Sequence, residues 1–386
     1  MRLRFRGHLG ENFWLGRDHP LASYDAFGAD IGHAADRVFR IALLIPMSGA
    51  AGIWGPSCLS CGQLAVREIN AGGGIKGCPV EVNVIDCAHE AGPLPQVELA
   101  WLLDHGLVDA VIGMHISAVR QQIIDVIRGR APFVYTPIYE GGETAPSVYA
   151  LGETPQRLLG PAIDYLTRQY RIKRWALIGN DYVWPRRSHD YVRKKLAQDG
   201  LDLVQERYVT FQSGTLSDEI ERLAASRAEA VLVSLVGQDA VDFNRHFGAR
   251  NLHRSMIRLS GAIEENGLLA SGLRNTERLF VASSYFSTLD TERNLAFCER
   301  YRAFHADRAP IPNALGQSIY EGFHFLAGLL ASAGEQPIAA PLVLRAPLHY
   351  TSVRKARFLS NASTASEIYL ARANGGAFED FIRMSG

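Results

Sequence analysis

The sequence has few cysteines and no excess of charge of either sign. Lys plus Arg and Asp plus Glu each number 40 among 386 residues, which gives a formal net charge of zero. Binding to nucleic acid or to an anionic membrane through overall charge requires a basic excess, so direct binding to nucleic acid is not predicted. Runs of apolar residues stay well short of the roughly 18 residues that a membrane span requires. The composition therefore indicates a globular protein.

The five cysteines are too few for a disulfide scaffold in a chain of this length. Two of them form 58-CLSC-61, a spacing that also occurs in redox and metal sites. Cys58 and Cys61 share one stripe of an expected helix with Ala65 and Ile69, and no second pair of cysteines or histidines stands at ligand spacing. Buried apolar cysteines are thus favoured, and no metal site is predicted.

Sequence signatures of common enzymes are also absent. No G-x-S-x-G, H-E-x-x-H or G-x-x-x-x-G-K-[ST] motif occurs, and the histidines stand singly. The run 72-GGGIKG-77 contains a lysine but follows an expected helix, so it is interpreted as a helix end and turn rather than a phosphate loop. No catalytic residue and no cofactor are predicted.

The first residues, MRLRFRGHLGENFWLGRDHP, are basic but lack the apolar block of a secretion signal. If Met1 is the true start, a cytoplasmic location is expected, whereas a start further upstream would leave the periplasm open. Residues 1–38 show no sustained periodicity and are expected to be an extension that precedes the folded core.

From residue 39 onward, short β-rich runs alternate with amphipathic stretches about every 30 residues. Runs such as 40-RIALLI-45, 110-AVIG-113 and 230-AVLVSL-235 are almost continuously apolar, which suits parallel strands covered on both faces. The stretches between them, such as residues 57–70 and 155–170, have helical periodicity. This alternation predicts an α/β fold with two doubly wound parallel sheets.

The chain length and a linker at 150-ALGETP-155 favour two lobes. We expect residues 39–153 and 284–340 to form lobe 1, and residues 154–283 and 341–386 to form lobe 2. The C-terminal region is expected to end in a β-hairpin.

Polar and aromatic residues collect where the expected strands end. In doubly wound sheets, ligands bind beyond the carboxyl ends of the strands. Together these loops supply hydroxyls, main-chain amides and aromatic walls, which a small-molecule cleft requires. The predicted ligand-binding residues are His115, Ser117, Tyr135, Thr136, Pro137, Tyr182, Trp184, Gly237 and Ser260.

Three motifs give this sequence a family resemblance. The motifs 139-YEG-141, 179-GNDYVWPR-186 and 285-YFSTLDT-291 occur in the order found in type I periplasmic binding proteins. They are most similar to those of the branch that contains the amide-binding negative regulator of the aliphatic amidase operon and the urea-binding proteins of ABC transporters. The resemblance covers the chain from about Phe39 to its C-terminus.

The resemblance implies a ligand cleft between two lobes joined by hinge strands. It implies that Ser117 hydrogen-bonds the ligand, that residues 135–137 line one wall, and that Tyr182 and Trp184 close from the other lobe. The sequence departs from the amide regulator at His115, where that regulator has tyrosine, and in the Tyr-Thr-Pro-Ile-Tyr segment. Both departures fall in the expected pocket.

The leading hypothesis is a non-enzymatic cytoplasmic sensor of a small neutral amide or urea-like ligand. The resemblance implies an antiterminator-type regulatory protein as its partner, and a homo-oligomer is left open. The alternative is a periplasmic receptor that delivers urea, short amides or branched-chain amino acids to an ABC permease. An amidase-type enzyme ranks third.

Overall fold

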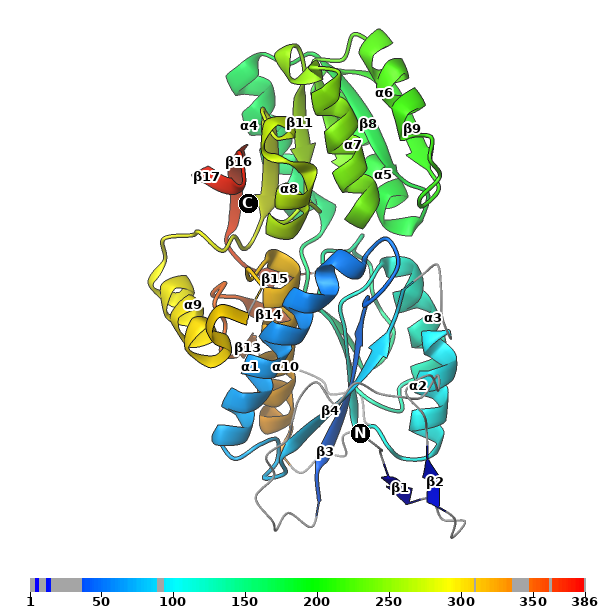
Figure 1. The fold of residues 1–386 in the computed structure, drawn as a ribbon, viewed down its shortest axis with the longest axis vertical. Coiled ribbons are helices and arrows are strands. Elements are labelled where there is room, and N and C mark those ends of the chain that lie inside the picture. Colours follow the sequence, from blue (N-terminus) through cyan, green and yellow to red (C-terminus); the bar gives the residue numbers. More distant parts are fainter. Residues whose placement is uncertain are drawn as a thin grey trace.

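The computed structural model describes residues 4–6, 12–14, 37–88, 94–308, 310–334, 347–360 and 363–384. Figure 1 shows two lobes stacked along the long axis of the molecule, each built around its own main sheet. Most of the extension expected at residues 1–38 lies outside the described residues. Within it, β1 (Arg4–Arg6) pairs antiparallel with β2 (Asn12–Trp14).

Lobe 1 contains, in the described part of the chain, a parallel sheet in the order β4-β3-β5-β6-β7. Its strands are β3 (Phe39–Ile45), β4 (Val80–Asp86), β5 (Ala110–Gly113), β6 (Phe133–Tyr135) and β7 (Val148–Ala150). The connecting helices are α1 (Gly55–Ala71), α2 (Pro95–Asp104) and α3 (Ser117–Ile127). From much later in the chain, α9 (Glu292–His305) and α10 (Ala314–Ser332) return to pack against α1.

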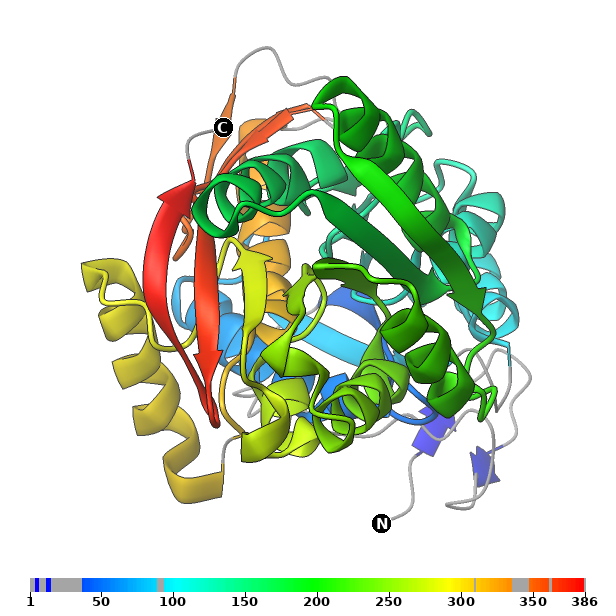
Figure 2. The same ribbon diagram turned by 90° about the horizontal axis from the view of Figure 1, so that it is seen from above.

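Lobe 2 is built on a larger sheet in the order β17-β16-β12-β11-β10-β8-β9. Its strands are β8 (Arg174–Asn180), β9 (Asp202–Val209), β10 (Ala230–Ser234), β11 (Ile257–Ser260), β12 (Leu279–Ser283), β16 (Ile368–Asn374) and β17 (Ala377–Met384). Its helices are α4 (Pro155–Tyr170), α5 (Val183–Gln198), α6 (Leu216–Ala225), α7 (Gly237–Ala249) and α8 (Glu265–Ser271). β16 and β17 form the predicted terminal hairpin and join the sheet antiparallel to β12, along the edge that is red in Figure 2.

The burial of the strands follows from their sequences. Every residue of β5, β6, β10 and β11 is buried, because helices cover both faces of the parallel sheets. β9 instead alternates between exposed and half-buried residues, as expected for a strand at the edge of a sheet. The predicted α/β fold with parallel-sheet lobes is confirmed.

The chain passes between the lobes after β7, after β12 and again between α10 and β16. The small sheet of β13 (Leu348–His349), β14 (Arg357–Ser360) and β15 (Ser363–Ala365) lies along the last passage. Leu348 and Phe358 belong to the core of lobe 1, although residues 341–386 were expected in lobe 2. The expected boundary at residue 340 lies outside the described residues. We propose that the chain divides into lobes as expected from the sequence, except that β13 and β14 belong to lobe 1.

The burial of the cysteines and the character of the described helices are consistent with the globular protein that the composition indicates. Cys58 and Cys61 on α1 have no exposed surface, which confirms that the 58-CLSC-61 pair is part of the core. All five cysteines are free thiols. In the described part of the chain, no helix combines the length and the apolar character needed to cross a membrane.

Candidate functional site

The carboxyl ends of the strands of both lobes face each other across a closed cleft. Between them lies a cavity of about 30 Å³. Its lining residues are Trp54, Met114, His115, Ile116, Ser117, Tyr135, Pro137, Ile138, Tyr182, Trp184, Val236, Ala262 and Leu315. None of these side chains is a carboxylate, lysine or arginine, so the cavity offers hydroxyls, main-chain groups and apolar walls rather than a charged partner.

Ser117 is the first residue of α3, and this helix begins at the cavity. The Ser117 side chain is buried, and its Oγ has no hydrogen bond of normal geometry with a described residue, although it lies close enough to the Tyr135 hydroxyl to oppose the rise in the pKa of that phenol. The first N–H groups of a helix have no acceptor within the helix and carry a partial positive charge. An unpaired hydroxyl at such an end favours a carbonyl or carboxylate oxygen as its partner.

Tyr135 and His115 form the wall behind Ser117. The Tyr135 hydroxyl donates to the main-chain oxygen of His115 at 2.6 Å. His115 Nδ1 lies 3.2 Å from the carbonyl oxygen of Ile116. Since a carbonyl only accepts, Nδ1 carries the proton and Nε2 is an acceptor without a partner among the described residues. Burial lowers the pKa of His115 to about 3, so the ring is neutral at physiological pH.

Glu140 of the Tyr-Glu-Gly motif lies outside the cavity and anchors α3. The buried guanidinium of Arg120 on α3 donates to Glu140 Oε1 at 2.7 Å, and its Nε lies 3.2 Å from Glu143 Oε2. The same guanidinium lies 5.0 Å from the ring centre of Tyr135 and 5.3 Å from that of Tyr139. Glu140 and Tyr139 thus hold the loop and helix in place rather than contact the ligand.

Lobe 2 contributes aromatic walls at the start of α5. Tyr182 precedes the first helical residue, and its ring centre lies 6.3 Å from that of Trp184 and 5.6 Å from that of Phe211. Trp184 is almost completely buried. Burial also raises the pKa of Tyr182, so its hydroxyl stays protonated.

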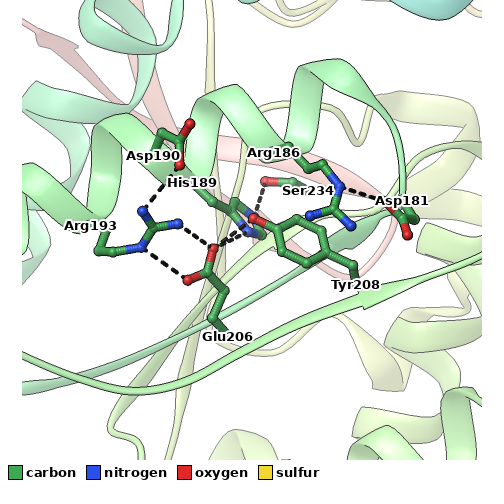
Figure 3. A network of polar contacts seen from close by, with 8 residues as sticks. All are labelled: Asp181, Arg186, His189, Asp190, Arg193, Glu206, Tyr208 and Ser234. Atoms are coloured by element: carbon green, nitrogen blue, oxygen red, sulfur yellow. Dashed lines mark hydrogen bonds and ion pairs between the residues drawn. The ribbon is translucent and has the colours of Figure 1, made fainter.

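A polar network fixes α5 on the sheet (Figure 3). His189 Nε2 lies 3.1 Å from Ser234 Oγ at the end of β10, whereas Nδ1 lies 3.7 Å from Glu206 Oε1, beyond hydrogen-bond length. Arg193 donates to both oxygens of Glu206, and the Tyr208 hydroxyl donates to Glu206 Oε1 at 2.6 Å. Because His189 and Ser234 are buried, their contact stabilises the helix that positions Tyr182 and Trp184.

Six of the nine predicted residues line the cavity, namely His115, Ser117, Tyr135, Pro137, Tyr182 and Trp184. The other three do not. Thr136 Oγ1 lies 2.9 Å from Ser318 Oγ of α10, and Ser260 Oγ accepts a hydrogen bond from the Ala262 amide. Gly237 approaches the main chain of Ala50 so closely that a Cβ there would lie 2.2 Å from its oxygen.

Seven of the thirteen lining residues were not among the predicted site residues, and Trp54 and Leu315 illustrate why. Trp54 follows β3 in the short helix η1 (Gly52–Trp54), so its place at a strand end was a usable signal. Leu315 comes from α10, 180 residues beyond Tyr135, and no local pattern indicates that it reaches the cleft.

The two lobes are in direct contact on one side of the cavity. The Gln238 amide of α7 donates to the Ala50 carbonyl oxygen at 2.8 Å. Asn313 Nδ2, at the start of α10, donates to Glu264 Oε2, at the start of α8, at 2.6 Å. A volume of about 30 Å³ is roughly that of one water molecule in the liquid. Entry of a larger ligand therefore requires the lobes or the aromatic walls to move.

In the described residues, no three His, Cys, Asp or Glu side chains gather as they would around a metal ion. The two lobes and the neutral cavity between them are the features that a binding protein for small molecules requires. Residues 38–377 match the family model described as periplasmic binding protein, and the chain belongs to this family.

Individual relatives agree with this assignment. A Leu/Ile/Val-binding protein homolog from Brucella melitensis is 24% identical over 311 residues, which are 75% of this chain and 78% of that protein. The branched-chain amino acid substrate-binding protein LivJ of Streptococcus pneumoniae, solved with isoleucine, has a TM-score of 0.77 at 17% identity and covers 90% of this chain and 100% of its own.

A solute-binding protein from R. palustris, solved with 4-hydroxybenzoate, has a TM-score of 0.78 at 15% identity and covers 90% of this chain and 97% of its own. The type I periplasmic-binding-protein fold is thereby confirmed, and the chain is a solute-binding protein, not an enzyme. The closer similarity to the amide regulator and the urea-binding proteins stays a prediction.

Proposed function

We propose that this protein is the solute-binding receptor of an ABC transporter and acts in the periplasm. Its ligand is a small organic molecule with a carboxylate or amide group on a compact apolar body. The observation that carries the proposal is the buried Ser117 hydroxyl at the start of α3, in a cavity where the other side-chain polar groups are His115 Nε2 and the tyrosine hydroxyls, among apolar and aromatic walls.

The neutral lining of the cavity favours a monocarboxylate or a short amide over an α-amino acid as the ligand. An α-amino acid needs partners for its ammonium group as well as for its carboxylate, and no carboxylate lines the cavity. The Asp239 carboxylate near the cleft already accepts hydrogen bonds from the Asn180 side-chain amide and the Gln212 main-chain amide. A monocarboxylate needs only donors for its oxygens, which Ser117 and the start of α3 supply, and a short amide also finds an acceptor for its N–H group at His115 Nε2.

The relatives support the transport role over the sensor role. Proteins of this fold have been solved with isoleucine, benzoate and 4-hydroxybenzoate, each of which carries a carboxylate. The antiterminator-type partner implied by the resemblance, and the cytoplasmic location expected from the first residues, have no supporting observation in the described fold or among these relatives. We therefore propose an ABC permease as the partner.

A thermal-shift panel tests the ligand class. The compounds are benzoate, 4-hydroxybenzoate, isoleucine, leucine, acetamide, propionamide and urea. A ligand at about 100 times its Kd adds about 2.7 kcal/mol to the free energy of unfolding and raises Tm measurably. We expect a shift with a monocarboxylate or an amide and a smaller shift with the amino acids. A shift with the amino acids alone would contradict the proposed class.

Ser117→Ala is the matching test of the site. Loss of one hydrogen bond to the ligand should weaken binding by about 1–3 kcal/mol, which is roughly five- to 150-fold in Kd. Ser188→Ala is the control, because Ser188 Oγ is also buried and unpaired but lies on α5 outside the cavity lining. Equal effects of the two substitutions in calorimetric titration would argue against a ligand contact at Ser117.

A further inference from the structure

A second depression lies at the end of lobe 2 that faces away from the cleft. It has a volume of about 730 Å³. One side is the loop between α7 and β11, which contains η2 (Leu252–Arg254), and the other is the loop before β12, which contains η3 (Leu273–Asn275). Both loops lead into the amino ends of neighbouring parallel strands. The ligand cleft lies at the carboxyl ends of the strands, so the strands separate the two sites.

Arginines dominate this depression, which we call the distal arginine pocket. Its lining includes Arg254, Arg274 and Arg278, and a single carboxylate, Glu277. That carboxylate already has a neighbour, because Glu277 Oε2 lies 3.3 Å from His253 Nε2. The lining therefore holds more positive than negative charge, although the net charge of the whole chain is zero.

The surrounding carboxylates do not neutralise these arginines. Asp242 and Glu221 pair with Arg245 and Arg250, which lie outside the lining. Arg278 Nη1 reaches only main-chain oxygens, those of His253 and Arg254, each at 3.4 Å. Like charges gathered in this way repel one another unless an anion joins them.

A fully buried arginine adds to the positive potential from beneath. Arg258 on β11 donates to the main-chain oxygens of two pocket residues, Asn275 at 2.7 Å and Glu277 at 2.5 Å, and to Asn244 Oδ1 at 2.5 Å. All of these acceptors are neutral. Burial lowers the pKa of Arg258, and the charge of the Glu277 carboxylate opposes this effect in part.

The chemistry of the lining selects a class of anion. The planar fork of a guanidinium group binds two phosphate oxygens at once, which a point charge cannot do. The depression is open to solvent, and at about 730 Å³ it has room for an organic molecule larger than a free phosphate ion. The Asn251 amide and the Glu277 carboxylate supply hydrogen-bonding groups for hydroxyls beside the arginines.

We propose that the distal arginine pocket binds a phosphorylated organic molecule with a hydroxyl-bearing body. A sugar phosphate and a nucleotide share this chemistry. The pocket is independent of the ligand cleft, so the proposal stands whether or not the ligand class of the cleft is correct.

Isothermal titration of the full chain at low ionic strength tests the pocket. The probes are glucose 6-phosphate, ADP and inorganic phosphate, with glucose and adenosine as uncharged counterparts. We expect binding of glucose 6-phosphate or ADP, which separates the two sources, and none of glucose or adenosine. Added salt should weaken the binding. Absence of binding by both organic phosphates, or binding of inorganic phosphate as tightly as either, would overturn the proposal.

A charge-matched pair of variants locates the site. Arg254→Gln with Arg274→Gln removes two exposed side chains of the pocket, so the fold should be kept, as checked by circular dichroism and Tm. Arg187→Gln with Lys194→Gln removes the same charge from exposed positions on α5. We expect the pocket variant to bind at least tenfold more weakly and the α5 variant to bind as the wild type does. Equal Kd values for the two variants would refute the assignment.

Discussion

His115 is a titratable side chain that stays uncharged beside the ligand cavity. Its ring is buried at the end of β5 against Phe133, with ring centres 6.1 Å apart. The neighbouring Gly113 leaves the space for it, because a Cβ there would lie 2.5 Å from His115 Nε2. The cavity wall therefore keeps the same charge over the physiological pH range.

The buried neutral ring makes stability depend on pH in one direction. The folded protein holds His115 unprotonated down to about pH 3, whereas the unfolded chain takes up a proton below about pH 6.5. The stabilisation is complete above the unfolded pKa and is lost as the pH falls, by about 1.4 kcal/mol per pH unit for this group. We expect His115→Asn to reduce the slope of unfolding free energy against pH between these values. Parallel urea-unfolding curves for the variant and the wild type across this range would contradict the assignment.

The expectation that ligands bind beyond the carboxyl ends of the strands identified the residues of the cavity only in part. Tyr135 and Pro137 line the cavity while Thr136 points to α10, because successive side chains of an extended chain face opposite sides. That alternation was available from the sequence and would have removed Thr136 from the prediction. Leu315 could not have been found in this way, because its position depends on how α10 packs against the first sheet.

At the scale of elements, α5 carries the lobe 2 half of the site. Tyr182 and Trp184 lie at its start, and its buried side contacts β9 and β10 through His189, Glu206 and Ser234 (Figure 3). The aromatic wall thus depends on polar contacts that do not touch the ligand. His189 is a positioning residue in this arrangement.

A double-mutant cycle on His189 and Ser234 tests this coupling. His189→Leu leaves the buried Ser234 hydroxyl without its partner and should lower the unfolding free energy by about 1–3 kcal/mol. Adding Ser234→Ala removes that unpaired group, so the double variant should lose less than the sum of the single losses. Urea unfolding measures the three variants. Additivity within about 0.5 kcal/mol would show that the two side chains act independently.

Elements were predictable where their apolar pattern was long or continuous. β5 was expected at 110-AVIG-113, and the strand spans Ala110–Gly113. β7, α7 and α8 were missed. β7 has three residues, too few for a periodic signal, and the linker expected at 150-ALGETP-155 starts within it. α7 begins at Gly237, which was expected in the loop after β10, and the structure gives this glycine a φ of +55°, a conformation that favours glycine.

At the scale of the whole molecule, contacts between the lobes hold the cleft closed. Asn313 serves both lobes, because its Oδ1 accepts from the Gly316 amide at the start of α10 while its Nδ2 donates to Glu264 of lobe 2. Glu264 in turn accepts from the first amides of α8. Closure thus joins the starts of two helices, one in each lobe.

Asn313→Asp separates these two roles. The aspartate keeps an acceptor for the start of α10 but places a carboxylate against Glu264, so the closed state should lose stability relative to the open state. A loss of about 1.4 kcal/mol would weaken ligand binding about tenfold. Small-angle scattering should show a larger radius of gyration. Asn313→Ser, which can cap the helix without adding charge, is the control. An unchanged radius and Kd in Asn313→Asp would contradict this role of the contact.

α10 and β16 come late in the sequence, which affects how the protein folds while the ribosome synthesises it. The sheet of lobe 1 is encoded by residue 150, but α10, which packs against its first helix, ends only at Ser332. The main sheet of lobe 2 gains β16 and β17 from the last twenty residues of the chain. Neither lobe is complete in a nascent fragment, and both wait for contacts between residues far apart in the chain, which slow folding. The protein is therefore expected to need its whole length translated before either half becomes resistant to proteases.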